Sequence, residues 1–228
     1  MATISANLQA VRSRMAAAAR ACGRDPSDVG LIAVSKTFGA DAIADAYGQG
    51  QRAFGENYVQ EALEKIEALS ALEIQWHYIG PIQSNKTRLI AENFAWVHSV
   101  DRAKIAERLS AARPATLAPL EICIQVNIGM EDTKSGVAPA DTLALARAVS
   151  SVPRLRLRGL MTVPPPTTDR AEQQRYFAAL RYLKETLTAA GVAVDTLSMG
   201  MSADLDAAIA EGATLVRVGT AIFGGRNG

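Results

Sequence analysis

Short apolar segments alternate with segments of helical periodicity along almost the whole chain of 228 residues. Most of the apolar segments are nearly continuous, as is typical of parallel strands that are covered on both faces. Alternating strands and helices with short connections indicate a parallel sheet, and eight such units close a (β/α)₈ barrel. The sequence therefore predicts an α/β fold, a single (β/α)₈ TIM-type barrel. Its strands are expected at residues 31–36, 52–55, 74–80, 96–99, 121–127, 156–161, 196–198 and 215–218.

An extra N-terminal helix is predicted at about residues 4–22, because Ile4, Leu8 and Val11 share one helical face. The remaining chain is divided into strand–helix units of about 24 residues, which make a compact barrel. We therefore expect residues 1–228 to form one domain, with no room for a second catalytic domain. An open doubly wound sheet is the rival fold. No G-x-G-x-x-G motif follows the first strand, which argues against that rival.

The composition excludes several classes of function. Lys and Arg number 24 against 23 for Asp and Glu, and a net charge of +1 predicts no nucleic-acid partner. Cys22 and Cys123 have no metal-ligand spacing and make no secreted disulfide framework, so no metal is expected. No apolar run approaches the ~18 residues of a membrane span, and the N-terminus lacks a signal peptide. We expect a cytoplasmic protein with no membrane partner, and a monomer because no exposed apolar stripe stands out.

The first predicted strand ends in Lys36, and chemistry in such barrels collects at the carboxyl ends of the strands. Side chains alternate along a strand, so Ile32, Val34 and Lys36 share a face. If that face points inward, the Lys36 ammonium lies at the barrel mouth. A desolvated lysine is a usable nucleophile for Schiff-base chemistry. The alternative is a lysine that simply leaves the strand into solvent.

The last predicted strand carries Arg217 between Val216 and Val218, which predicts an inward-pointing guanidinium. A buried arginine must be paired or must bind something, because an unpaired buried charge is costly. Structural ion pairing is the alternative interpretation. Gly219 and Thr220 follow directly, and they offer backbone N–H groups and a hydroxyl at the strand end.

The seventh predicted strand ends in a glycine turn at residues 198–202. We expect Ser202 to cap a short helix that begins near Ala203, because a helix N-terminus presents N–H groups to an anion. The loops after strands seven and eight form the recurrent phosphate site of such barrels. These features predict a phosphate site, although Asp204 and Asp206 could satisfy the helix dipole instead.

Other strand ends carry weaker signals. Asn57 lies at the second strand end, where a helix cap is the alternative, and His77 in the third strand is more often a structural residue. Lys134, in the loop after the fifth strand, is expected to be solvated. A mouth lysine, an inward arginine and a phosphate cradle suit a phosphorylated aldehyde or ketone held as a Schiff base. Pyridoxal 5′-phosphate meets all three requirements, whereas a lysine-type sugar-phosphate aldolase leaves Arg217 unexplained.

Longer strings of residues carry a family resemblance from the N-terminal helix to the last residues. In them the chain resembles the pyridoxal phosphate homeostasis protein family, which implies a barrel like the N-terminal domain of alanine racemase. The strings are residues 33–36, 54–58, 76–86, 97–101, 126–127, 133–136, 159–161, 197–202 and 216–224.

The resemblance also implies roles for particular residues. It implies that Lys36 holds pyridoxal 5′-phosphate (PLP) as an internal aldimine, a Schiff base, and that Arg217 faces the pyridine nitrogen. It implies that the phosphate is held by Ser202, Gly219 and Thr220. Lys134 matches a family lysine discussed as a second, transient contact of the cofactor. The rest of the pocket would be lined by Asn57, His77, Ser198 and Met201.

An arginine in that position restricts the chemistry of the bound cofactor. Arginine cannot act as an acid at neutral pH, so the ring nitrogen stays unprotonated and the ring is a weak electron sink. Racemisation tolerates such an arginine but needs an acid–base pair on both faces, for which Tyr58, Tyr78 or His77 are speculative partners of Lys36. We expect a non-enzymatic carrier or buffer in intracellular PLP homeostasis, with no catalytic residues and transient contact with PLP-dependent apoenzymes. The alternative is a single-domain PLP-dependent amino-acid racemase.

Overall fold

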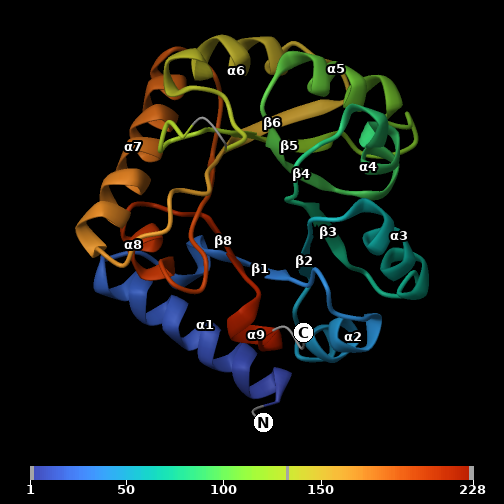
Figure 1. The fold of residues 1–228 in the computed structure, drawn as a ribbon, viewed down its shortest axis with the longest axis vertical. Coiled ribbons are helices and arrows are strands. Elements are labelled where there is room, and N and C mark those ends of the chain that lie inside the picture. Colours follow the sequence, from blue (N-terminus) through green and yellow to red (C-terminus); the bar gives the residue numbers. More distant parts are fainter. Residues whose placement is uncertain (1–2, 132–133, 226–228) are drawn as a thin grey trace.

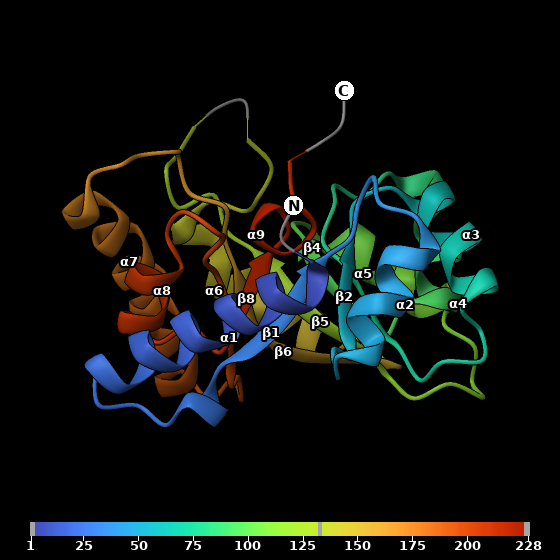
Figure 2. The ribbon, with the colours of Figure 1, turned by 90° about the horizontal axis from the view of Figure 1, so that it is seen from below.

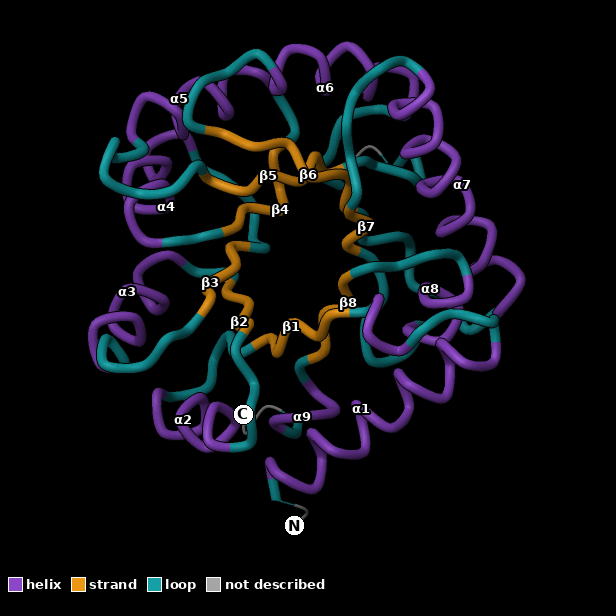
Figure 3. The backbone as a smooth tube through the Cα atoms, turned by 180° about the vertical axis from the view of Figure 1, so that it is seen from behind, coloured by secondary structure: helices purple, strands orange, loops and turns teal. Residues whose placement is uncertain are grey.

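Eight parallel strands follow one another around a closed barrel in the computed structural model, which describes residues 3–131 and 134–225 (Figure 3). The ring closes where β8 pairs with β1, in a register from Gly30 opposite Leu215 to Ala33 opposite Val218. The predicted barrel is confirmed, and the open-sheet rival is wrong. The strands are β1 (Gly30–Val34), β2 (Ala53–Glu56), β3 (Gln75–Tyr78), β4 (Trp96–Val100), β5 (Leu120–Gln125), β6 (Leu155–Met161), β7 (Thr196–Ser198) and β8 (Leu215–Val218).

The observed strands begin within one residue of the predicted starts, but three of them end earlier than predicted. β1, β3 and β5 each stop two residues before the expected end. At β1 the last paired residue is Val34, opposite Gly55 of β2. The chain beyond it leaves the ladder and turns toward α2, so Lys36 belongs to the loop at the barrel mouth and not to the strand.

Helices surround the ring of strands on the outside (Figures 1 and 3). Each buries one stripe against the barrel; α5, for example, buries Ile105, Ala106 and Leu109 on one face. The main core lies between helices and strands, and its largest fully buried side chains include Phe54, Phe94 and Phe177. The helices are α1 (Ile4–Ala21), α2 (Ala40–Gly48), α3 (Val59–Ala68), α4 (Thr87–Asn93), α5 (Ala103–Ala112), α6 (Thr142–Ser150), α7 (Arg170–Ala189), α8 (Leu205–Ala210) and α9 (Thr220–Phe223).

The predicted N-terminal helix is α1, whose first turn is capped by the Thr3 hydroxyl. It packs across α8 and α9, which follow the last two loops of the barrel mouth (Figures 1 and 2). Asn7 donates a hydrogen bond to the Ile222 carbonyl (2.9 Å), and Arg14 donates to the Ser202 carbonyl (2.7 Å). The extra helix therefore anchors the segments that follow β7 and β8.

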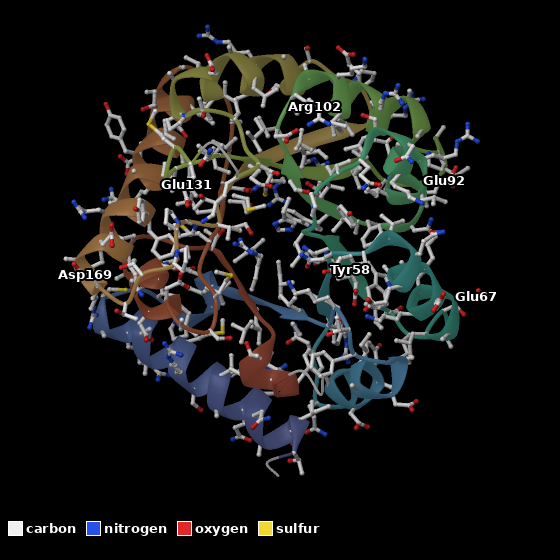
Figure 4. All side chains as sticks on the ribbon, viewed as in Figure 1. Tyr58, Glu67, Glu92, Arg102, Glu131 and Asp169 are labelled. Atoms are coloured by element: carbon white, nitrogen blue, oxygen red, sulfur yellow. The ribbon has the colours of Figure 1, made fainter. Side chains whose placement is uncertain are left out.

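The carboxyl ends of the strands meet on one side of the barrel. Figure 2 shows the described parts of the loops after β5 and β6 projecting on the same side as α9. Figure 4 places Tyr58 on the side of α3 that faces the centre of the ring, whereas Glu67 and Glu92 lie on the outside. Over the described residues, no helix is both long enough and apolar enough to span a bilayer.

Candidate functional site

The barrel interior holds a buried cation. Arg217 of β8 is only 4% exposed, so the prediction that it points inward is confirmed. Its Nη1 donates to the Ser198 hydroxyl (2.7 Å) and its Nη2 donates to the Thr162 carbonyl (2.8 Å). These partners are neutral, and among the described residues no carboxylate forms an ion pair with Arg217, so oxygen dipoles solvate the guanidinium charge. Such an arrangement leaves the charge available to a ligand at the mouth.

A chain of hydrogen bonds continues from Ser198 across the barrel interior. The Ser198 hydroxyl lies 2.8 Å from His98 Nδ1, and His98 Nε2 lies 2.9 Å from His77 Nδ1. His77 Nε2 then lies 3.0 Å from Gln75 Oε1, at the exposed start of β3. Trp96 stacks on the His77 ring. A polar network thus occupies a place where barrels of this type are usually filled by branched apolar side chains.

The two ends of this chain assign its direction. Arginine only donates and the amide oxygen of Gln75 only accepts. His77 Nε2–H then donates to Gln75. With both imidazoles neutral, His98 Nε2–H donates to His77, the Ser198 hydroxyl donates to His98, and Ser198 Oγ accepts from Arg217.

Burial enforces the same protonation states. It lowers the pKa of His77 to about 3. It also lowers the pKa of His98 well below its ordinary value, and the Arg217 charge adds to the effect. Burial lowers the pKa of Arg217 to about 10, so this side chain still carries its charge at neutral pH. The interior therefore holds one cation and two neutral histidines.

A cavity of about 480 Å³ opens above Arg217, within the size range of small-molecule sites. Seven of the nine residues predicted to hold a ligand line it, and the other two, His77 and Ser198, do not. Both are buried; Ser198 contacts Arg217 directly, and His77 is linked to Ser198 through His98. The seven lining residues are Lys36, Asn57, Met201, Ser202, Arg217, Gly219 and Thr220.

Two glycines allow the close packing of this cavity wall. A Cβ at Gly219 would lie 3.1 Å from the Val34 carbonyl oxygen, so glycine lets the end of β8 approach the end of β1. A Cβ at Gly80 would lie 2.2 Å from the Asn57 carbonyl oxygen, which the Tyr78 hydroxyl also contacts (3.2 Å). The ends of β3 and β8 thereby set the positions of Asn57 and of the Gly219 backbone.

One acceptor in the cavity wall lacks a partner. Among the described residues Asn57 Oδ1 is buried without a hydrogen bond, and a buried unsatisfied acceptor costs about 1–3 kcal/mol. The same wall also contains hydrogen-bond donors, which are the hydroxyls of Ser202 and Thr220 and the side-chain nitrogen of Lys36. The wall thus combines an unused acceptor with donors that suit an anion.

The expectation that Ser202 caps a helix near Ala203 is wrong. The helix α8 begins at Leu205 and its N-cap residue is Asp204. The Asp204 carboxylate turns back to accept the Met201 N–H (2.6 Å), and the Asp204 N–H is bonded to the Met201 carbonyl (3.2 Å). This closed turn postpones the helix and leaves the Ser202 side chain in the cavity wall.

Lys134 lies outside the cavity lining. It forms an ion pair with Glu131 Oε2 (2.6 Å) and donates to the Pro164 carbonyl (3.4 Å). The expectation that Lys134 is solvated is therefore wrong, because the side chain is half-buried and has two partners. Thr133, which belongs to one of the family strings, lies outside the described residues.

The sequence interpretation missed His98 and Thr162. His98 alternates with Trp96 and Val100 along β4, a pattern that marks all three as sharing one face. The pairing of His77 with Trp96 across β3 and β4 brings the two histidines together, and the sequence does not contain that register. Thr162 contributes a backbone carbonyl, for which no side-chain signal exists.

Comparisons with known proteins match the whole chain. The family described as "Alanine racemase, N-terminal domain" matches residues 6–227. The pyridoxal phosphate homeostasis protein of Pseudomonas aeruginosa is 59% identical over 100% of this chain and 97% of its own length. The protein of that name from Escherichia coli K12 is 50% identical over 100% and 98%. The structure of PipY from Synechococcus elongatus with PLP bound superposes with a TM-score of 0.84 at 40% identity, covering 97% of this chain and 100% of PipY.

The buried histidines predict a specific dependence of stability on pH. The His77 pKa is about 3 in the folded chain and near 6.5 in the unfolded chain. Between these values the unfolded chain binds a proton that the folded chain excludes. The contribution of His77 to stability is therefore fully present above pH 6.5 and is lost as the pH drops toward 3, by about 1.4 kcal/mol per pH unit.

Urea unfolding at pH 7, 6, 5 and 4 checks this expectation. His77→Gln removes one titrating group, so its free energy of unfolding should fall less steeply with pH than that of the wild type. Asn93→Gln serves as a control that changes no titrating group. Parallel pH profiles for the wild type and His77→Gln would show that the histidine is not held neutral by the fold.

Proposed function

Since this chain belongs to the pyridoxal phosphate homeostasis protein family, we propose that it binds PLP in the cavity at the barrel mouth and acts as an intracellular carrier of this cofactor. One observation carries the proposal. Lys36, in the loop after β1, and the buried Arg217 of β8 line the same cavity, because β1 and β8 are neighbours across the barrel closure. The 40% identical PipY, solved with PLP bound, supports the choice of cofactor.

The residues of the cavity fit this cofactor. PLP supplies a reactive aldehyde on a pyridine ring that carries a phosphate. The Lys36 amine suits the aldehyde, Arg217 suits the ring nitrogen as a donor, and the unpartnered Asn57 Oδ1 suits a hydroxyl. The phosphate would be held by Ser202, Gly219 and Thr220, with Met201 against the apolar part of the ring.

Lys36 provides a reversible attachment. Its Nζ adds to the aldehyde carbon, a carbon–nitrogen double bond forms, and the aldehyde oxygen leaves as one water molecule. Addition of water would break this double bond and return the aldehyde and the free Lys36 amine, whereas an amine of another protein would take over the double bond to that carbon and release the Lys36 amine. A reversible bond of this kind keeps a reactive aldehyde from other amines while allowing its release.

The cavity wall supports a carrier over a racemase. Racemisation needs proton-transferring groups on both faces of the substrate. Among the described residues that line the cavity, Lys36 is the only such group, with no carboxylate, histidine or tyrosine beside it. The Tyr78 hydroxyl is engaged by two backbone carbonyls and burial raises its pKa to about 12, while His77 lies below Arg217. The relatives are likewise named as homeostasis proteins and not as enzymes.

The near-neutral net charge bears on the partners of the proposed carrier. A net charge of +1 supports weak, transient docking to PLP-dependent apoenzymes and no binding of nucleic acid. We propose that it works in the cytoplasm as a monomer, where PLP-dependent enzymes are the recipients.

Lys36→Ala should abolish the absorbance band that appears when PLP is added to the wild-type protein, because the covalent bond needs the Lys36 amine. Borohydride reduction followed by peptide mass spectrometry should locate the cofactor on Lys36 in the wild type. Lys104→Ala removes an exposed amine and should leave both results unchanged. A band that persists in Lys36→Ala would overturn the assignment.

Thr220→Val should weaken the binding of PLP about tenfold while leaving the binding of pyridoxal, which lacks the phosphate, nearly unchanged, because a hydrogen bond to a charged group is lost. Fluorescence titration with both compounds measures this ratio. Thr186→Val on the exposed face of α7 is the control. An equal loss for both compounds would place the phosphate elsewhere.

The PLP-loaded protein should not catalyse sustained exchange of the amino-acid Cα proton with solvent deuterium, because a second proton-transferring group is missing from the cavity wall. Each amino acid is incubated with the loaded protein in deuterium oxide and followed by NMR. Turnover well beyond one equivalent with any amino acid would support the racemase and contradict the carrier.

A further inference from the structure

A buried ionic cluster lies directly behind the segment that carries Lys36. Glu56, at the end of β2, is 0% exposed, and Lys65 of α3 is 5% exposed. Lys65 Nζ donates to Glu56 Oε1 (2.8 Å) and also contacts Glu61 Oε1, one turn earlier in α3. We call Glu56, Lys65 and Glu61 the β2–α3 cluster. Neither Glu56 nor Lys65 lines the cavity at the barrel mouth.

The cluster holds the residue before Lys36. The Ser35 hydroxyl donates to Glu56 Oε1 (2.6 Å), and the Ser35 carbonyl accepts from Lys65 Nζ (2.9 Å). Ser35 is itself fully buried. The hydroxyl and the carbonyl of this residue are therefore bonded to charged side chains, which make stronger hydrogen bonds than neutral partners do, while its N–H donates to the Gly55 carbonyl (3.0 Å).

The cluster also holds the residue after Lys36. The Thr37 N–H donates to Glu61 Oε1 (2.6 Å). Thr37 has a φ of 70°, in the left-handed region that side chains other than glycine rarely adopt. Such a backbone conformation persists only where the surroundings hold it in place. Here the Phe38 N–H closes the turn on the Ser35 carbonyl (3.0 Å), and the hydrogen bond to Glu61 holds the Thr37 N–H at the point where the chain turns from β1 toward α2.

Burying the charges of this cluster costs desolvation free energy. Burial raises the pKa of Glu56 despite its hydrogen bonds to Lys65 and Ser35. Glu56 Oε2 has no partner among the described residues. Buried ion pairs are often no more stabilising than apolar residues of similar size. Barrel stability is therefore a weak explanation for these buried charges. Fixing the backbone on both sides of Lys36 accounts for their contacts with Ser35 and Thr37.

We propose that the β2–α3 cluster is a positioning device for Lys36: it clamps the backbone on both sides of this residue so that its amine is presented to the cavity in one orientation. The inference rests on the proposed function, because it takes Lys36 as the point of attachment. None of the three cluster residues needs to touch the cofactor. When the amine is already oriented, less conformational entropy is lost on reaching the transition state for bond formation, which is the general advantage of a preorganised nucleophile.

Glu61 is the residue to change, because it is partly exposed and its loss leaves Lys65 paired with Glu56. Glu61→Ala removes the acceptor for the Thr37 N–H, and Glu61→Gln keeps an amide oxygen in its place. Glu67→Ala is the matched control, since Glu67 lies on the outside of the same helix (Figure 4). The first measurement is the rate constant for covalent attachment of free pyridoxal, which lacks the phosphate and reports on the amine.

Glu61→Ala should slow attachment about tenfold, and Glu61→Gln should restore the rate to within about twofold of the wild type. The second measurement needs no cofactor: exchange of the Thr37 amide hydrogen, followed by NMR, should accelerate at least tenfold in Glu61→Ala and stay protected in Glu61→Gln. A purely structural role would shift the urea midpoint without rescue of the attachment rate by glutamine.

Wild-type attachment and Thr37 protection in Glu61→Ala would overturn the clamp and leave the role of Lys36 intact. Equal slowing in Glu61→Gln would also overturn it, because charge and not the acceptor would then be responsible. Failure of the proposed function is recognised separately, by an absorbance band that survives Lys36→Ala.

Discussion

The buried guanidinium of Arg217 is the constraint on which the interior of this barrel depends. A permanent cation inside a closed barrel must find oxygen acceptors, and Ser198 and Thr162 supply them. Ser198 Oγ accepts from Arg217, and with both histidines neutral and the Gln75 amide oxygen accepting from His77, the Ser198 hydroxyl donates to His98. Burial keeps both histidines neutral, and at His98 the nearby Arg217 charge adds to this effect.

A second ionic system lies on the other side of β1, between β2 and α3. It contacts the backbone on both sides of Lys36 and leaves the cavity to the Lys36 side chain. Lys36 is thus flanked by the Arg217 network inside the barrel and by the β2–α3 cluster outside it. Within the described cavity wall no second proton-transferring side chain accompanies this lysine, and the proposed carrier function rests on that arrangement.

Local sequence patterns predicted much of this arrangement, and their failures have identifiable physical causes. Alternation along β8 predicted the inward Arg217, and continuous apolar runs predicted all eight strand starts within one residue. The cap at Ser202 failed because Asp204, two residues later, competes for the turn by accepting the Met201 N–H. His98 was missed because its importance depends on the register between β3 and β4. The spacing of Glu61 and Lys65 by four residues was visible, but their contact with residues 35 and 37 was not.

The sequence by itself determined the number and order of the strands, the closed barrel and the residue types at the strand ends. These properties depend on periodicity and spacing, which are local along the chain. Only the tertiary structure decided which polar groups meet. Closure of β8 on β1 brings Arg217 and Lys36 to one cavity, register places His77 against His98, and packing of α3 against β2 puts Lys65 beneath Ser35. Hydrogen bonds act over about 3 Å between residues far apart in sequence, so no local pattern encodes them.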